Sequence, residues 1–234
     1  HSTSARDVAG RSVMLGFLRL PSVRATQPRE GFGGGMQQVS ERDVRGRRVP
    51  LLDVDEARAR ALDVGVPDGM AELNVFRILL HDPPTAAALN GLLHRLLWKG
   101  SLDQRLRELA IMRIGWVSGA VYEWTQHWHV AVALGIDEAD LIAVRDWEHH
   151  DGFGPVERAV LAATDETLAR GAIGDSTWAA CAEHLDAALL VELVAVIGNW
   201  SLFARLLKSL DVPLDDGMEP WPPDGCGPEE GVER

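Results

Sequence analysis

The chain has little of several features that would each indicate a particular class of protein. Two cysteines in 234 residues cannot form a disulfide framework, and so few predict a reducing, cytoplasmic setting. No run of about 18 uncharged apolar residues occurs, so the sequence predicts no membrane span. The longest apolar stretch, Ala187–Trp200, is interrupted by Glu192 and Asn199 and is typical of a buried helix. The alternation of a half-buried β-strand is also missing, which favours an all-α fold.

Positive charge is scarce outside the N-terminal region. The net charge is −12, but residues 1–48 hold nine Lys/Arg against four Asp/Glu, or +5, which leaves −17 for the rest. An acidic body argues against a nucleic-acid partner, because phosphate backbones require a basic footprint. We expect residues 1–48 to be a flexible extension. For residues 1–35 a targeting peptide fits weakly, and sequence upstream of a start at Met36 fits at least as well.

Helical periodicity begins near residue 55 and continues almost without interruption. Apolar spacing and breaks at glycine and proline predict helices over 55–62, 69–80, 84–98, 102–118, 122–134, 137–147, 156–170, 176–184 and 187–210. Ser101 and Gln104 resemble a capping box at the start of the fourth. One helical domain over 49–213 is therefore expected. Residues 214–234, rich in acidic residues, proline and glycine, are expected to be a tail with little regular structure.

The helices predicted over 102–118 and 122–134 hold the most informative residues. Glu123 and His127 are four residues apart and share one helix face. Glu108 could reach that face if the two helices are antiparallel. A carboxylate and an imidazole in an apolar pocket suit proton transfer, because desolvation raises carboxylate pKa values. The alternatives are a surface Glu–His pair and, for Glu108, a solvated carboxylate.

Other side chains could shape or anchor a substrate in such a pocket. These candidates are Trp116, Trp124, Trp200, Arg113 and Asn199. An arginine fork pairs well with a substrate carboxylate, although an internal salt bridge is the expected alternative for any one arginine. Asn199 either satisfies a buried backbone group or faces a pocket.

No metal site is predicted. The side chains of His127 and His129 point about 200° apart on a helix and cannot hold one ion together. His149, His150 and Asp151 are adjacent in a predicted loop, where such residues are usually solvated.

The segment Leu106–Ala110, followed by Gly119, Tyr122, Glu123 and His127, resembles the core motif of the carboxymuconolactone decarboxylase and alkylhydroperoxidase-D-like (AhpD-like) superfamily. Segments in the second half, among them 157–161 and 190–194, are similar to longer members. The resemblance extends over about residues 73–217. It implies an AhpD-like helical bundle that assembles as a homo-oligomer.

The peroxidase branch of this superfamily uses a Cys-x-x-Cys pair followed by a histidine. Aligned on Gly119 and His127, the two cysteine positions hold Ala120 and Glu123, while Glu108 falls on the glutamate of the proton relay. No thiol peroxidase activity is therefore expected, because the thiolate is the nucleophile.

The acid–base half of the site remains. Together with the resemblance it implies a cofactor-free, decarboxylase-type lyase acting on a small carboxylated lactone or related organic acid. In this hypothesis Glu123 and His127 exchange protons and Glu108 orients His127. An isomerase, dehydratase or cyclase at the same site is an alternative, as is a non-catalytic oligomer that binds a small molecule. The expected partners are a small-molecule substrate and further copies of the chain, with neither nucleic acid nor membrane.

Overall fold

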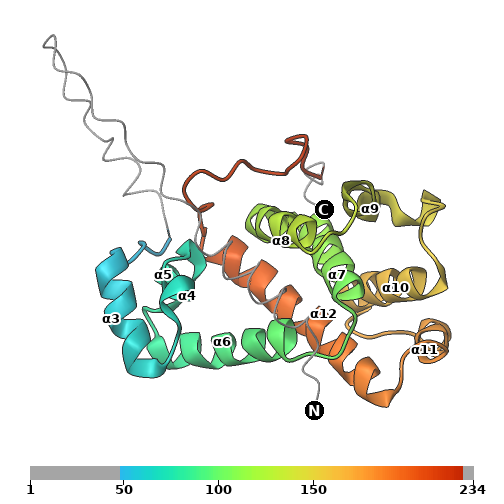
Figure 1. Cartoon of the computed structure of the whole chain (residues 1–234), viewed down its shortest axis with the longest axis horizontal. Helices are drawn as coiled ribbons and strands as arrows, with labels where there is room; N and C mark the ends of the chain where they lie inside the picture. Colours follow the sequence, from blue (N-terminus) through green and yellow to red (C-terminus); the bar gives the residue numbers. More distant parts are fainter. Residues whose placement is uncertain (1–47, 229–234) are drawn as a thin grey trace, which may run out of the picture.

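A computed structural model describes residues 48–228 and shows a bundle of α-helices (Figure 1). No β-strand occurs within this range, in agreement with the all-α prediction. The extension predicted over residues 1–48 lies, apart from Arg48, outside the described residues. The same is true of the last six residues of the predicted tail.

The helices follow one another through short turns. In order they are α3 (Val54–Val64), α4 (Asp68–Ala71), α5 (Asn74–Leu79), α6 (Pro83–Trp98), α7 (Gln104–Val117), α8 (Val121–Ala133), α9 (Glu138–Ala143), the 3₁₀ helix η1 (Val144–His149), α10 (Pro155–Arg170), α11 (Asp175–Ala182) and α12 (Ala187–Ser209). α12 crosses the middle of the molecule, with α3–α6 on one side and α9–α11 on the other (Figure 1).

Aspartates at several helix N-termini explain where the helices begin. The side chains of Asp53, Asp82 and Asp186 accept hydrogen bonds from backbone N–H groups that have no partner within the helix. At α7 the N-cap is Asp103, not the predicted Ser101. The backbone N–H groups of Ser101 and Leu102 donate instead to Glu192 of α12, at 2.9 and 3.0 Å. A tertiary contact therefore replaces the local capping box.

Two predicted helices are each divided in the structure. The helix expected over 69–80 is split into α4 and α5, because Leu73 adopts an extended backbone conformation. The helix expected over 137–147 continues as η1, in which Asp146 has non-helical angles.

α7 lies at the centre of the fold. It packs against α8, α10 and α12, and its middle residues, from Leu106 to Met112, are all buried. Apolar side chains on several faces of α7 pack against these three helices. Functional groups on α7 are therefore held in a buried, closely packed part of the molecule.

α12 is the longest helix and the most apolar. By length and composition it could span a membrane, with a mean hydropathy of 1.8, but 56% of that window is buried inside the fold. Its buried face includes Leu193, Ile197 and Trp200. These contacts are those of a core helix, which passes the same test.

Residues 214–228 form turns and no helix, yet they are packed against the helices. The indole of Trp221 packs against Trp116 and Trp124, with ring centroids 5.9 and 6.0 Å apart. The indole N–H of Trp124 donates to the carbonyl of Pro222 at 2.8 Å. This segment therefore belongs to the folded body, although its composition is typical of a solvated tail.

Candidate active site

The hairpin of α7 and α8 brings the three predicted proton-transfer residues together. Its turn contains Gly119, whose φ of +60° favours glycine. Gly115 allows the helices to approach closely, because a Cβ at this position would lie 3.1 Å from the backbone nitrogen of Trp124. The antiparallel arrangement places Glu108 of α7 against His127 of α8.

Glu108 and His127 form a buried pair. Glu108 is fully buried, and its Oε2 lies 2.7 Å from Nδ1 of His127. Its Oε1 accepts hydrogen bonds from Nε and Nη2 of Arg107, at 3.0 and 2.9 Å. Burial alone would raise the pKa of Glu108, but His127 and Arg107 outweigh it and the pKa lies below its usual value. Glu108 is therefore a carboxylate that fixes the imidazole ring.

The other ring nitrogen of His127 meets an indole. Nε1–H of Trp200 donates to Nε2 of His127 at 2.9 Å. Because an indole nitrogen is only a donor, this contact requires an unprotonated Nε2 and places the ring proton on Nδ1, toward Glu108. Burial lowers the pKa of His127, whereas the carboxylates of Glu108 and Glu123 raise it above its usual value. A proton taken up at Nε2 breaks the Trp200 hydrogen bond.

Glu123 is the third member of this group. It is 3% exposed, and its Oε1 lies 3.6 Å from Nε2 of His127. The pKa of Glu123 is raised to about 7: burial raises it most, His127 lowers it, and the Glu108 carboxylate raises it. A carboxyl group with this pKa can either donate or accept a proton near neutral pH.

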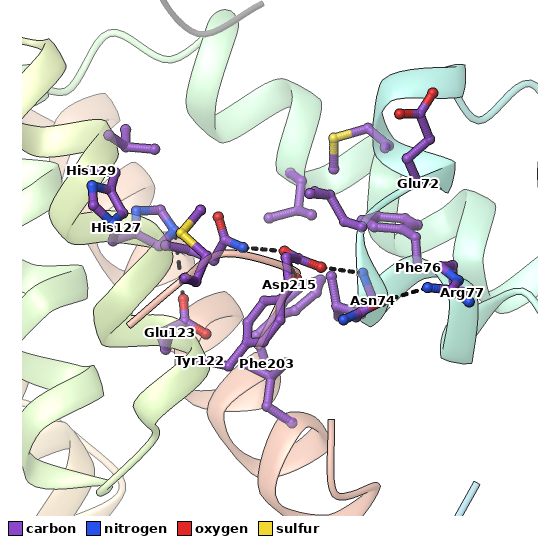
Figure 2. A pocket seen from close by; sticks show the side chains of 18 of the residues that line it. Glu72, Asn74, Phe76, Arg77, Tyr122, Glu123, His127, His129, Phe203 and Asp215 are labelled. Carbon is purple, nitrogen blue, oxygen red and sulfur yellow. Dashed lines mark hydrogen bonds and ion pairs between the residues drawn. The ribbon is translucent and has the colours of Figure 1, made fainter. Parts of the chain in front are cut away.

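Glu123 and His127 face a cavity of about 340 Å³ whose walls are mostly apolar (Figure 2). α3–α6, α8, α12 and the segment after α12 all contribute to its lining. The apolar and aromatic part of the lining includes Phe76, Leu93, Leu97, Trp98, Trp200 and Phe203. The acid–base pair therefore faces a largely apolar space of the size that binds small organic molecules.

Sequence reasoning missed a second polar group in this cavity. Asp215 lies between α8 and α5 (Figure 2), and its carboxylate accepts a hydrogen bond from the hydroxyl of Tyr122 at 2.8 Å. Asn74 and Gln126 also donate to it. The local sequence holds no signal for this role, because Asp215 lies in a stretch whose composition is that of a solvated tail.

Several predicted pocket residues lie elsewhere, and of the three tryptophans predicted for the pocket only Trp200 lines the cavity. Trp116 and Trp124 belong to a separate aromatic cluster, where the guanidinium of Arg145 lies 4.7 and 5.0 Å from their ring centroids. The expectation that they shape the substrate pocket is wrong for this cavity, because their side chains leave α7 and α8 toward η1 and Trp221.

Arg113 and Asn199 do not line the cavity either. Arg113 makes the internal salt bridge that was the alternative, with its Nε 2.7 Å from Oδ1 of Asp165. Asn199 is 3% exposed, and neither side-chain polar atom has a hydrogen-bond partner within the described chain.

Within residues 48–228, no group of three His, Cys, Asp or Glu side chains is arranged to hold a metal ion. His149 instead pairs with Asp146 and His150 with Asp140, in each case through a ring nitrogen and a carboxylate oxygen.

Comparison with known proteins agrees with this architecture. Residues 83–166, which run from α6 into α10, match the model of the Carboxymuconolactone decarboxylase family. The matched range includes Glu108, Glu123 and His127 but not Asp215. A search of curated proteins found no match.

Solved structures share the fold at low sequence identity. The debrominase Bmp8, in a variant with one cysteine replaced by alanine and in complex with 2,3,4-tribromopyrrole, gives a TM-score of 0.59 at 18% identity, over 74% of this chain and 95% of that chain. An uncharacterised peroxidase-related protein with an AhpD core from Ralstonia eutropha JMP134 gives 0.58 at 21% identity, over 73% and 93%. A protein of unknown function from Agrobacterium tumefaciens gives 0.54 at 19% identity, over 58% and 93%.

The fold is thus that of the AhpD-like helical proteins. Together with the family match over residues 83–166, it supports the resemblance to the carboxymuconolactone decarboxylase and AhpD-like superfamily.

Proposed function

We propose that the protein is a cofactor-free acid–base enzyme, a lyase or an isomerase, that acts on a small organic molecule in the cavity next to Glu123 and His127. The observation that carries this proposal is the Glu123–His127–Glu108 arrangement. A carboxyl group with a pKa of about 7 lies 3.6 Å from an imidazole nitrogen, and a buried carboxylate fixes the other side of the ring.

The pair can hold one exchangeable proton, either on Glu123 or on Nε2 of His127. The unprotonated member removes a proton from a substrate carbon next to an electron-withdrawing group. The protonated member returns a proton to another atom of the substrate, either a carbon in an isomerisation or a leaving oxygen in an elimination. A proton then passes between the two residues and restores their starting protonation states. The cycle transfers protons only and needs no redox cofactor.

Glu108 has a different part in this scheme. It is fully buried and does not line the cavity, so it acts as a positioning residue. It keeps the ring proton on Nδ1 and leaves Nε2 for chemistry. When Nε2 gains a proton, the nearby carboxylate stabilises the imidazolium ion.

Thiol peroxidase chemistry is not part of the proposal. Cys181 is buried in the apolar core, where burial raises the pKa of its thiol, and Cys226 is exposed in the segment after α12. Neither cysteine lines the cavity. Although two of the similar structures belong to peroxidase-related or antioxidant-type proteins, their sequence identities of 21% and 19% support only a common fold.

The experiment is a substrate screen that compares wild type with Glu123→Gln and His127→Ala. Small ketones, hydroxy-ketones, lactones and β-keto acids are tested for product formation by mass spectrometry and for exchange of carbon-bound hydrogen with deuterated water. We expect both variants to lose turnover by roughly 10²–10⁴-fold, the range of general acid–base catalysis. Glu219→Gln, which changes an exposed carboxylate, is the matched control and should retain full activity.

Unchanged rates in both variants would refute the acid–base assignment. A wild-type protein that binds these compounds but exchanges no hydrogen would favour the alternative function, a small-molecule-binding protein. The apolar cavity suits that alternative, whereas the raised pKa of Glu123 favours the enzyme, since a buried acid whose ionised form is destabilised is costly to keep.

A further inference from the structure

Asp215 is a cavity residue supplied by a part of the chain outside the matched family region. Its Oδ1 accepts a hydrogen bond from the backbone N–H of Asn74 at 2.7 Å. Its Oδ2 accepts from the hydroxyl of Tyr122 at 2.8 Å and also from the side-chain amide of Gln126. Donors from α5 and α8 therefore hold this carboxylate in one position at the cavity wall (Figure 2).

Acidic groups predominate among the charged residues that line the cavity. They are Glu72, Glu123, Asp215 and Asp216. Glu72 is already paired with Arg58 at 2.8 Å. Apart from Tyr122 and Arg77, the remaining titratable side chains are His127 and His129, and the ring of His127 is held by Glu108 and Trp200.

Arg77 is the single lysine or arginine among the described residues that line the cavity, and its side chain is engaged in hydrogen bonds within the fold. Its Nε donates to the carbonyl of Leu52 at 2.8 Å, and its Nη1 donates to Oδ1 of Asn74 at 2.9 Å. A carboxylate ligand would therefore meet fixed negative charge without a dedicated cation. An ammonium ligand would lose its hydration against the apolar wall, while Asp215 already has three donors.

We infer that the cavity selects uncharged small molecules over carboxylates and that Asp215 is a principal determinant of this selectivity. The inference names the substrate class of the same site and rests on the proposed function only where it calls the ligand a substrate. An uncharged substrate has no carboxylate to lose. Elimination or isomerisation next to a carbonyl group is then the reaction, in place of the decarboxylation that the family resemblance implied.

The test uses three probes of similar size that differ in charge. Acetylcyclohexane is uncharged, cyclohexanecarboxylate is an anion of nearly the same shape, and cyclohexylmethylamine is a cation. Binding to the whole protein is measured at pH 8 by isothermal titration and by the fluorescence of the cavity tryptophans, Trp98 and Trp200. We expect the ketone to bind about tenfold more tightly than the carboxylate, or better, as expected for an uncompensated charge in a partly desolvated site.

Asp215→Asn removes the charge while retaining an oxygen that can accept from Asn74. It should reduce the preference for the ketone over the carboxylate to about threefold or less, mainly by tightening the carboxylate. Glu219→Gln removes the same charge from an exposed position in the same segment and should leave the preference unchanged.

A second measurement needs no variant. When the pH falls from 8 to 6, Glu123 gains a proton while the probe carboxylate stays ionised, so the preference for the ketone should narrow. This arm tests the charge selectivity of the cavity through Glu123 even if Asp215→Asn does not fold.

Equal or tighter binding of the carboxylate, tightest binding of the amine, or no binding of the ketone would each overturn the inference. So would an Asp215→Asn protein that is folded and has the wild-type preference. The probes report binding and not turnover. A protein that shows the preference but no hydrogen exchange therefore supports the inference and contradicts the proposed enzyme. Turnover of carboxylates alone would support the proposed enzyme and contradict the inference.

Discussion

Glu123 is an acid that the fold holds in a place where its ionised form is costly. Its side chain is almost fully buried on the α8 face toward the cavity, and its pKa is about 7 in place of the ordinary 4.5. The protonated form is therefore the one that the folded protein favours. A residue of this kind reduces stability at high pH, and function is a reason for a protein to keep it.

This cost predicts a pH-dependent gain in stability for Glu123→Gln. The folded pKa lies above the unfolded value, so the stabilising contribution of the protonated group is complete below about pH 4.5 and is lost as the pH rises through about 7. Glutamine mimics the neutral acid at every pH. Urea unfolding at pH 8.5 should show the variant more stable than wild type by roughly 2–4 kcal/mol, and the difference should shrink toward pH 5.

The matched control is Glu219→Gln, whose exposed carboxylate should give no comparable pH-dependent difference. A Glu123→Gln protein that is less stable than wild type at pH 8.5 would show that the ionised carboxylate is well solvated or paired in the native state.

For individual residues, the sequence could identify the proton-transfer groups but not all of their hydrogen-bond partners. Glu123 and His127 were predictable because four-residue spacing on a helix is local geometry, and Glu108 because a hairpin of two helices follows from the turn at Gly119. The indole hydrogen bond from Trp200 was not, since it joins residues 73 positions apart. Tyr122 and Asp215 are 93 positions apart, and no periodicity connects them.

The α7–α8 hairpin is the element on which the acid–base geometry depends. Glu108 lies on one helix and His127 on the other, and Gly115 sets how closely they approach. The 2.7 Å contact is therefore sensitive to small changes in the separation of the two backbones.

Gly115→Ala tests this dependence. The new Cβ would lie 3.1 Å from the backbone nitrogen and 3.4 Å from the Cα of Trp124, and backbone atoms cannot rotate away. We expect a loss of about 1–3 kcal/mol in the free energy of unfolding, the usual cost of overpacking, together with reduced turnover. Urea denaturation and the hydrogen-exchange assay measure the two effects.

Gly91→Ala is the control for this substitution. Gly91 lies on α6, and a Cβ at this position would meet no neighbouring side chain or helix within 4 Å, so alanine should stabilise the helix by about 0.5–1 kcal/mol. If Gly115→Ala were equally stabilising, the close approach of the hairpin would not constrain the site.

Element boundaries show the same division between local and long-range information. Apolar spacing and capping residues place α6, α8, α10 and α12 within a few residues of their observed ends. The start of α7 differs because Glu192, from the other half of the chain, takes the N–H groups of Ser101 and Leu102. Contacts of this kind are fixed by tertiary structure and leave no local pattern.

For the whole molecule, the exposed face of α12 is a feature that residues 48–228 leave without a partner. Val191 is 70% exposed, Val194 44% and Leu202 41%, and Gly198 between them has open space around it. This spacing forms one continuous apolar stripe along the helix. We propose that further copies of the chain cover it in a homo-oligomer.

Replacing Val191 and Val194 together by Asp should shift the protein from oligomer to monomer, because two charges cannot be buried unpaired in an apolar interface. Size-exclusion chromatography with light scattering measures the change in mass. Leu62→Asp, at a 78% exposed position on α3, is the control and should leave the mass unchanged. A wild-type protein that is monomeric at micromolar concentration would contradict the proposal.

The segment after α12 has a consequence for how this protein could diversify. The proposed proton-transfer groups lie within the family region, whereas Asp215 comes from a separate stretch that is anchored through Trp221 and Pro222. The residues proposed for the reaction and the residue proposed for ligand selectivity would then lie in different parts of the chain. Exchanging residues 214–228 between relatives would then change the preferred ligand while the proton-transfer residues stay the same, a form of modularity within one domain.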